Sequence, residues 1–183
     1  MLLYRVFPHI DDARRGEPGH PLYIQPRQGM GRWDNPDKYL VRYLAVSPEC
    51  AIGEAFAHLK AWTPAMLRRP DLPGSERRIA VFQFDETTNP LIDLDDAATL
   101  VRLGLRPTDV VIRNRPKTQT IAAQIFDEGR WAGIRSWSYH RPQWPVVALW
   151  TQRSLKAHSI LGIAGHPALE EAADTLRKLR RGI

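Results

Sequence analysis

The side chains in this sequence that could do chemistry are an arginine, a tyrosine and a glutamate placed within one short stretch. Arg32 lies in a loop, Tyr43 begins a short apolar run, and Glu54 lies about two turns into the helix that follows. Arginine forms forked hydrogen bonds to phosphates. A carboxylate stabilises the oxocarbenium ion that develops when a glycosidic bond to ribose breaks, and a tyrosine ring can stack on a base. These residue types suit chemistry on an anionic dinucleotide and need no metal.

Three elements would position these residues. Glycine, asparagine and proline within GRWDNP (31–36) indicate a turn around the arginine. The run from Tyr43 to Val46 is typical of a short buried strand. Ser47 then predicts a helix N-cap, with Pro48 at the first helical position. Glu54 lies away from the apolar stripe of that helix and among small residues, although a solvated surface glutamate is the alternative.

The rest of the chain mixes strands and helices without strict alternation, which predicts an α+β or mixed α/β fold. Its 183 residues contain no repeat and no linker, so one compact domain over 1–183 is expected. Long loops are expected over 8–30 and 63–77. The expected strands cover 2–7, 43–46, 79–84, 90–94, 133–138 and 146–151. The expected helices run over 48–62, from Asp95 to Gly104 with Val101 inward, from Thr118 or Thr120 to Gly129, and from Pro167 to about 181.

The composition is that of an ordinary globular protein with an arginine-rich positive charge. Hydrophobic residues make up 43% and charged residues 25% of the chain. The formal charge is +6, and only five of the 26 basic residues are lysines. An anionic ligand or an acidic partner would match this surplus, and a charged soluble surface is the alternative.

The sequence gives few signs of a special compartment. A single cysteine, Cys50, excludes an internal disulfide and a CxxC motif. The apolar runs are shorter than a membrane span, and the N-terminus lacks the features of a signal peptide. We therefore expect a cytoplasmic protein with no membrane partner.

Common catalytic signatures are absent. The sequence contains no GxGxxG, no Walker A motif, no GxSxG and no HExxH. Glu54 and His58 stand at i and i+4 without further ligands nearby, so no metal site is expected. Ser138 and His140 could suggest a hydrolase, but the glycines of a nucleophile elbow are missing.

A series of short motifs in a fixed order covers nearly the whole chain. The motifs are Tyr4-Arg5, GRWDNP (31–36), YLAVSPECAIGEAF (43–56), LIDLDD (91–96), LGL (103–105), TQTIAAQIFDEGRWAGIRSWS (118–138) and VVALW (146–150). No single motif is decisive, but their order and spacing are specific. In this the chain resembles the RES-domain toxins of bacterial toxin–antitoxin pairs, a family named for an arginine, a glutamate and a serine.

The resemblance implies a compact fold like that of ADP-ribosyltransferases and an enzyme that destroys NAD. Family members cleave the nicotinamide–ribose bond by hydrolysis or phosphorolysis, so the chain would be an NAD glycohydrolase or NAD phosphorylase. NAD would be the substrate, with no cofactor. The family also implies inhibition by a DNA-binding Xre-type antitoxin, without direct nucleic-acid contact by the toxin, in a homodimer or a toxin–antitoxin hetero-complex.

The same resemblance implies the residues of the site. Arg5 and Arg32 match the arginines of the family and would bind the pyrophosphate or order a loop. Tyr43 matches the tyrosine of the YLA motif and would contact nicotinamide or the adjacent ribose. Glu54 would stabilise the cationic transition state or bind the ribose hydroxyls, and Ser138 would position the ribose. Structural alternatives are a buried ion pair for Arg5, a core aromatic for Tyr43 and a strand-end hydroxyl for Ser138.

The chain departs from the family pattern at two places. GRWDNP contains Asp34 as an additional residue relative to the usual GRWNP, which would shift the loop by one residue. Ser136 and Trp137 replace the usual tyrosine and proline, so the serine role could belong to Ser136, although spacing from Gly133 favours Ser138.

Two rival functions belong to other classes. The first is an ADP-ribosyltransferase that modifies a macromolecule; Glu49 would be its additional acid, but its place at a helix start explains it better as a capping residue. The second is a basic nucleic-acid or partner-binding module with six tryptophans. The arginines of the chain are dispersed, which argues against such a module.

Overall fold

The structure of the protein is a computed structural model that describes residues 1–150 and 155–183. The chain forms two compact units, each assembled from separated segments. The first unit contains Met1 with residues 24–44 and 84–155, and the second contains residues 2–23, 45–83 and 156–183. Both units combine helices with strands, which confirms the prediction of a mixed α/β fold.

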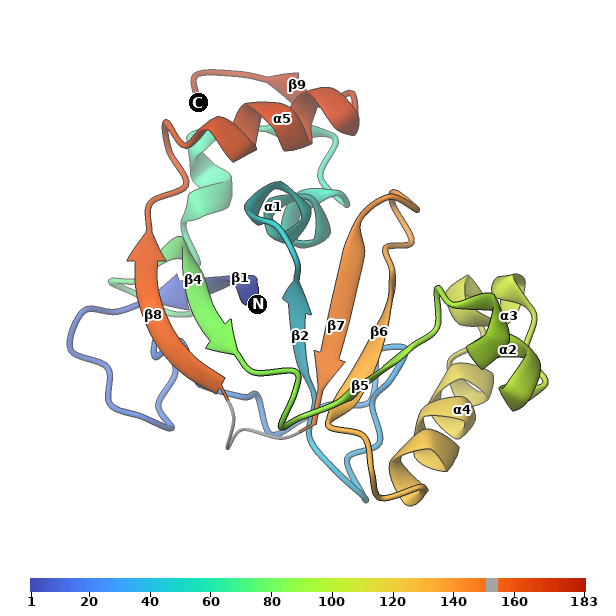
Figure 1. Ribbon diagram of the computed structural model, residues 1–183. Coiled ribbons are helices and arrows are strands. Elements are labelled where there is room, and N and C mark those ends of the chain that lie inside the picture. The colour runs from blue at the N-terminus through green and yellow to red at the C-terminus, as the bar shows by residue number, and fades with distance from the viewer. Residues whose placement is uncertain (151–154) are drawn as a thin grey trace. The chain divides into compact units, whose positions relative to one another are not determined.

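The first unit places three helices beside a group of strands (Figure 1). Its strands have the order β5-β6-β7-β2, in which β5 and β6 are parallel and β6 and β7 antiparallel. They are β5 (Leu91–Asp93), β6 (Gly133–Trp137), β7 (Pro145–Leu149) and β2 (Arg42–Ala45), whose last residue belongs to the second unit. The helices are α2 (Ala97–Leu103), α3 (Pro107–Val111) and α4 (Arg115–Asp127). Trp33, Ile92, Leu94, Ile125 and Ile134 are buried together in the core of this unit.

Local capping decides where the helices of the first unit begin. The carboxylate of Asp96, one residue later than predicted, accepts the N–H of Thr99 and starts α2. Asn114 caps α4 with Pro116 in its first turn, so α4 begins before the predicted Thr118. Val101, expected inside, is 80% exposed, because the short helix turns only one edge toward the core.

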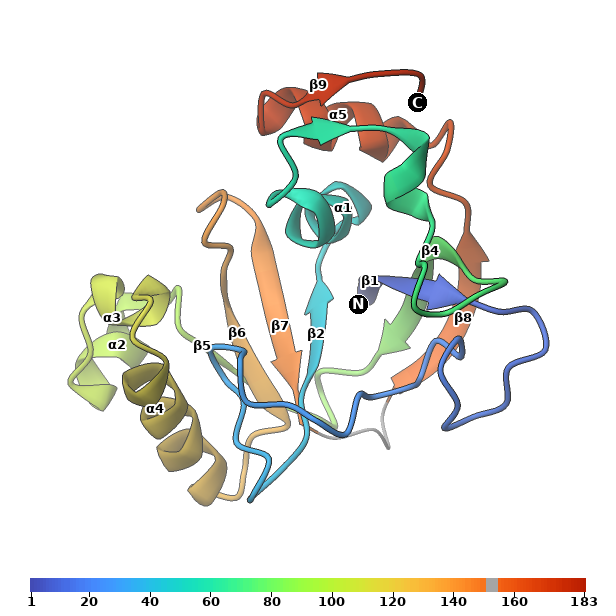
Figure 2. The same ribbon diagram turned by 180° about the vertical axis from the view of Figure 1, so that it is seen from behind.

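The second unit contains the N-terminal strand and the C-terminal helix. Its strands have the order β1-β4-β8, and β1 and β4 are antiparallel along their length. A separate parallel pair joins β3 to β9. The strands are β1 (Leu2–His9), β4 (Glu76–Phe84), β8 (Leu155–Leu161), β3 (Ala61–Trp62) and β9 (Leu179–Arg180). The helices are α1 (Pro48–Phe56), α5 (Pro167–Thr175) and the 3₁₀ turn η1 (Pro64–Leu67), and α5 packs beside α1 (Figure 2).

Helix α1 begins as predicted and ends six residues earlier than the predicted Trp62. Ser47 is its N-cap, and the hydroxyl accepts the N–H of Cys50. At the other end, the ammonium of Lys178 donates to the carbonyls of Ala57 at 2.6 Å and Leu59 at 2.8 Å. A distant lysine therefore satisfies carbonyls that end the helix, a partner that local sequence could not indicate.

The C-terminal part of the chain differs most from the prediction. Helix α5 ends at Thr175, and Arg177 has a left-handed φ of 52° that stops the helix before the predicted basic end. Strand β8 had no prediction, because its side chains are mostly exposed and show no alternation. Strand β9 lies where the sequence predicted the end of the last helix, so that part of the prediction was wrong. The predicted strand over 146–151 corresponds to β7, and Thr151 lies outside the described residues. In residues 1–150 and 155–183, the helices are too short or too polar to cross a bilayer.

Candidate active site

The carboxylate of Asp34 closes the loop that precedes β2. This side chain is only 5% exposed. Its Oδ2 accepts the backbone N–H groups of Gly29 and Gly31, both at 2.8 Å. Its Oδ1 accepts the hydroxyl of Tyr43 at 2.7 Å. A buried carboxylate is tolerated only when hydrogen bonds replace its water, and here it ties the loop to the strand.

Only glycine fits at position 31, because its surroundings leave no room for a Cβ atom. A Cβ atom at this position would lie 2.5 Å from Asp34 Oδ1 and 2.7 Å from Tyr43 Cζ, and closer still to the Tyr43 hydroxyl. The amide of Gln119, on α4, donates to the carbonyls of Gly29 at 2.8 Å and of Gly31 at 3.0 Å. The glycine of GRWDNP therefore permits the tyrosine hydroxyl to reach the loop.

The ring of Tyr43 is partly exposed, while its hydroxyl is held inward. The side chain is 39% exposed. The hydroxyl donates to Asp34 and accepts the N–H of Trp33 at 3.0 Å. Burial of the phenol, reinforced by the hydrogen bond to Asp34, raises the pKa of Tyr43 above its usual range. The phenol is therefore neutral at physiological pH, and the ring is the part of Tyr43 that a ligand can reach.

Two backbone carbonyls orient the guanidinium of Arg32. Nη1 donates to the carbonyl of Val110 at 2.9 Å, and Nη2 donates to the carbonyl of Trp137 at 3.2 Å. The guanidinium also lies 5.4 Å from the ring centroid of Trp33. Carbonyl oxygens carry no net charge, so these two bonds orient the arginine without neutralising it. The backbone N–H of Trp33, the residue that follows Arg32, donates to the Tyr43 hydroxyl at 3.0 Å, so Arg32 and Tyr43 lie near each other in the first unit.

The segment that contains both candidate serines lies beside Arg32. Ser138 is buried, and its Oγ accepts the N–H groups of His140 at 2.9 Å and Arg141 at 3.3 Å. This pattern organises the turn after β6, as expected for a strand-end hydroxyl. Ser136 is 2% exposed, and in the described part of the chain its Oγ has no hydrogen-bond partner. The choice between the two serines stays a prediction.

Glu54 and Arg5 belong to the second unit. Glu54 is exposed on α1. Burial raises the pKa of the Cys50 thiol on the same helix, and the charges of Glu54 and Glu49 act in the same direction. Because a protonated thiol is a poor nucleophile, Glu54 is the better candidate on α1 for a chemical role.

Arg5 lies on β1 and is bonded to the end of the N-terminal loop. Its Nη1 donates to the carbonyl of Tyr23 at 2.7 Å. Burial lowers the pKa of the Arg5 guanidinium to about 10, which still leaves it protonated at neutral pH. This contact favours the loop-ordering role over direct binding of the pyrophosphate.

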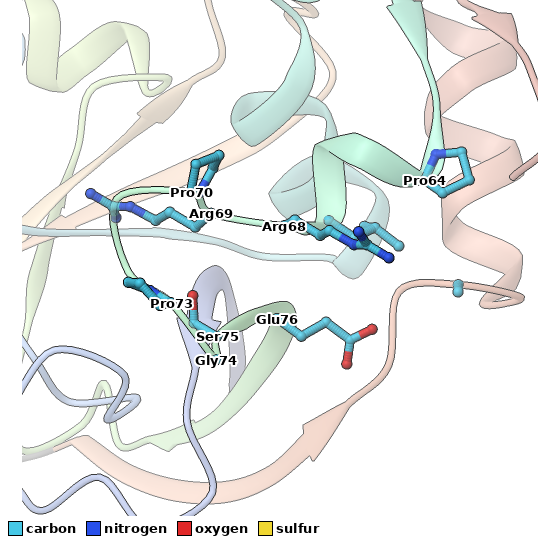
Figure 3. A pocket seen from close by; sticks show the side chains of 10 residues that line it. Pro64, Arg68, Arg69, Pro70, Pro73, Gly74, Ser75 and Glu76 are labelled. Atoms are coloured by element: carbon cyan, nitrogen blue, oxygen red, sulfur yellow. The ribbon is translucent and has the colours of Figure 1, made fainter.

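A cavity in the second unit contains none of these residues. Its volume is about 660 Å³, and it is lined in part by Arg68, Arg69, Glu76 and three prolines (Figure 3). Arg69 forms an ion pair with Asp71 at 2.8 Å. Within residues 1–150 and 155–183, no cluster of three or more histidine, cysteine, aspartate or glutamate side chains could hold a metal ion.

Comparison with known families identifies the fold. The sequence matches the family profile described as the RES domain from residue 2 to residue 169. The chain belongs to the RES domain family. This RES domain is similar to a solved structure, the crystal structure of the M. tuberculosis MbcT–MbcA toxin–antitoxin complex, with a TM-score of 0.64 and 17% identity. The similarity covers 94% of this chain and 88% of that chain. No curated protein matches the sequence.

The match confirms the family prediction, and every predicted site residue lies within the matched range of 2–169. The roles of these residues stay predictions, as does a single RES-type domain over 1–183. Sequence reasoning missed the roles of Asp34 and Gln119. The additional residue in GRWDNP was the only signal for Asp34, and nothing local indicates that Gln119 reaches the glycine loop.

Proposed function

We propose that this RES domain is the toxin of a toxin–antitoxin pair and that it consumes NAD by cleaving the nicotinamide–ribose bond. The family match over residues 2–169 carries the proposal, because the arginines, tyrosine, glutamate and serine all stand inside it in family order. The similarity of the fold to a chain from a toxin–antitoxin complex supports it.

In this proposal Glu54 is the electrostatic catalyst. When the bond between ribose C1′ and the nicotinamide nitrogen breaks, its electron pair leaves with nicotinamide, which departs neutral. The ribose is left as an oxocarbenium ion, and a carboxylate stabilises that positive charge. Exposure of Glu54 on α1 leaves the carboxylate accessible to a ligand.

Arg32, Tyr43 and a serine would supply the binding groups. The oriented guanidinium of Arg32 suits the pyrophosphate of NAD, and the exposed ring of Tyr43 suits stacking on nicotinamide. A serine of the 136–138 segment would hold the ribose. Arg5 would order the N-terminal loop through its bond to Tyr23.

The cation is captured by water or by phosphate. Water adds its oxygen to C1′ and loses a proton, which gives ADP-ribose. Inorganic phosphate gives ADP-ribose 1″-phosphate. A macromolecular acceptor would make the protein an ADP-ribosyltransferase, but Glu49 lies in the first turn of α1, where the helix dipole accounts for an acid.

The proposed partner is an antitoxin of the Xre type that binds the toxin and prevents NAD loss. Coexpression with such an antitoxin should restore growth to cells that the chain alone arrests. Copurification of the two proteins would then define the complex, and the purified chain would show whether a homodimer forms without antitoxin.

The decisive experiment is NAD turnover by the purified chain, with and without phosphate, with products identified by mass. We expect free nicotinamide with either ADP-ribose or its 1″-phosphate. Transfer of labelled ADP-ribose to protein or nucleic acid would indicate a transferase instead. Intact NAD after prolonged incubation would refute the proposed activity.

Glu54→Gln tests the catalyst. Removal of one electrostatic stabiliser typically lowers kcat by about 100-fold to 1,000-fold, and we expect a loss in this range. Glu171→Gln, an exposed glutamate on α5, is the matched control and should retain wild-type turnover. Circular dichroism should show that both variants are folded. Wild-type turnover by a folded Glu54→Gln protein would remove Glu54 from the mechanism.

A further inference from the structure

Asp34 is the one buried carboxylate in the described part of the chain, residues 1–150 and 155–183, and the sequence predicted only that it would shift the loop. Both of its oxygens are engaged within the first unit. Oδ2 binds two backbone N–H groups of the preceding loop, and Oδ1 binds the hydroxyl of Tyr43. A single side chain therefore connects the glycine loop to the tyrosine.

Asp34 occupies the position at which GRWDNP departs from the family motif that it resembles. GRWDNP is one residue longer than the motif it resembles, and the additional residue is the aspartate itself. The extra residue is turned inward, where it closes the loop from Gly29 to Asp34. The carboxylate thus supplies the loop with an acceptor for two of its own partly buried N–H groups.

The orientation of Tyr43 follows from the same carboxylate. The hydroxyl gives its proton to Asp34 and accepts the N–H of Trp33. With the hydroxyl fixed at both its donor and an acceptor position, the ring cannot swing about its Cα–Cβ bond without breaking two hydrogen bonds. The exposed ring face is thereby held in place before a ligand arrives, which lowers the entropy lost on binding.

We propose that Asp34 is a positioning residue that acts through Tyr43, holding the hydroxyl inward so that the ring, and not the hydroxyl, meets the nicotinamide riboside part of NAD. This inference rests on the proposed function, since it names how one residue of that site is prepared. It assigns Tyr43 a role in binding and excludes it as a proton donor or acceptor in the reaction.

A double-mutant cycle tests the coupling of the two residues. Asp34→Ala and Tyr43→Phe each remove the same hydrogen bond, and each should raise the KM for NAD by about 10-fold, with a smaller change in kcat. The double variant should be no worse than Asp34→Ala alone. Independent roles would instead multiply to about 100-fold.

Asp37→Ala is the matched control. Asp37 is an exposed carboxylate three residues further along the same loop, so its removal changes the charge by the same amount. Its KM should equal that of the wild-type chain. An equal rise in KM for Asp37→Ala and Asp34→Ala would reduce the effect to loop charge and overturn the positioning role.

A spectroscopic measurement separates positioning from a merely structural role. In protein carrying ¹³C at the tyrosine ring carbon bonded to oxygen, the Tyr43 signal is identified by its loss in Tyr43→Phe. In the wild-type chain it should still be that of a neutral phenol at about pH 10, where a free tyrosine is half ionised, and it should titrate at lower pH in Asp34→Ala, because the carboxylate and its hydrogen bond are gone. A Tyr43 signal unchanged by Asp34→Ala would refute the contact.

The outcomes distinguish this inference from the proposed function. If the wild-type chain does not consume NAD but binds it about 10-fold more tightly than Asp34→Ala does, the proposed reaction fails and the positioning role stands. If NAD is consumed and a folded Asp34→Ala protein keeps the wild-type KM, the positioning role fails alone. If the wild-type chain neither binds nor consumes NAD, both fail, whatever the tyrosine spectrum shows.

Discussion

Gly31→Ala should disturb the loop before β2 through a single added methyl group. The new Cβ would lie 2.5 Å from Asp34 Oδ1 and 2.7 Å from Tyr43 Cζ, with the Tyr43 hydroxyl nearer still. These side-chain atoms cannot move aside freely, because Asp34 and Tyr43 hold each other by a hydrogen bond of 2.7 Å. Either the backbone of the loop must shift or that bond must break.

The magnitude follows from these two possibilities. Forcing a methyl group into a packed site costs about 1–3 kcal/mol. Breaking a hydrogen bond to a charged group costs about 1.5–3 kcal/mol. Breaking the hydrogen bond makes part of the room that the methyl group needs, so the two costs do not add in full. We therefore expect a loss of about 3 kcal/mol in the free energy of unfolding. For a chain of this size that corresponds to a fall of about 6–12 °C in Tm.

The assay is thermal unfolding followed by circular dichroism, together with NAD turnover. Gly162→Ala is the matched control, since a Cβ at Gly162 meets no atom within 4 Å and its φ is not left-handed. The control should stay within about 0.5 kcal/mol of the wild-type chain. A Gly31→Ala protein that melts within about 2 °C of the wild-type chain and keeps its NAD turnover would refute the close approach.

Two further predictions concern stability. Lys178→Ala removes the ammonium that binds two carbonyls beyond α1 and should lower the free energy of unfolding by about 2 kcal/mol, as measured by urea unfolding, whereas the exposed Lys156→Ala should change it little. For Glu128, the hydrogen bond from the Trp131 indole, followed by those from Arg130 and Arg102, holds the pKa below its usual range. Because the pKa is lower in the folded state, the ionised carboxylate stabilises the protein at pH values above the unfolded-state pKa of about 4.3. This stabilisation is lost as the pH falls through the folded-state pKa. Glu128→Gln should therefore lower Tm at pH 7, and a Tm difference that does not shrink as the pH falls from 7 to well below the unfolded pKa would contradict this assignment.

The start of α1 shows what the sequence could indicate. Ser47 accepts the N–H of Cys50 within the first turn, and Pro48 stands at a position whose N–H would have no partner in the helix, so the pattern of these two neighbours alone predicted the helix start. The end of the same helix depends on Lys178, which is 121 residues away from Ala57. Local patterns carry no signal of such a partner, so the predicted helix continued too far.

The candidate site likewise has parts that local sequence motifs predicted and parts that depend on residues distant in the sequence. The motifs identified Arg32 and Tyr43, but the carbonyls that orient Arg32 come from residues 78 and 105 positions further along the chain. The additional Asp34 was expected only to shift the loop, whereas the structure uses it as the acceptor that organises the loop. In the sequence, a carboxylate between a tryptophan and an asparagine gives no sign of burial, and only the structure shows that three donors bind it.

The bond between Lys178 and the end of α1 also sets an order of events during synthesis. The carbonyl of Ala57 leaves the ribosome 121 residues before the lysine that binds it. At about 5–20 residues per second, this delay lasts roughly 6–24 seconds. During that time the helix that carries Glu54 has its N-cap but not its C-terminal partner, so its last turn is held only after Lys178 has been made.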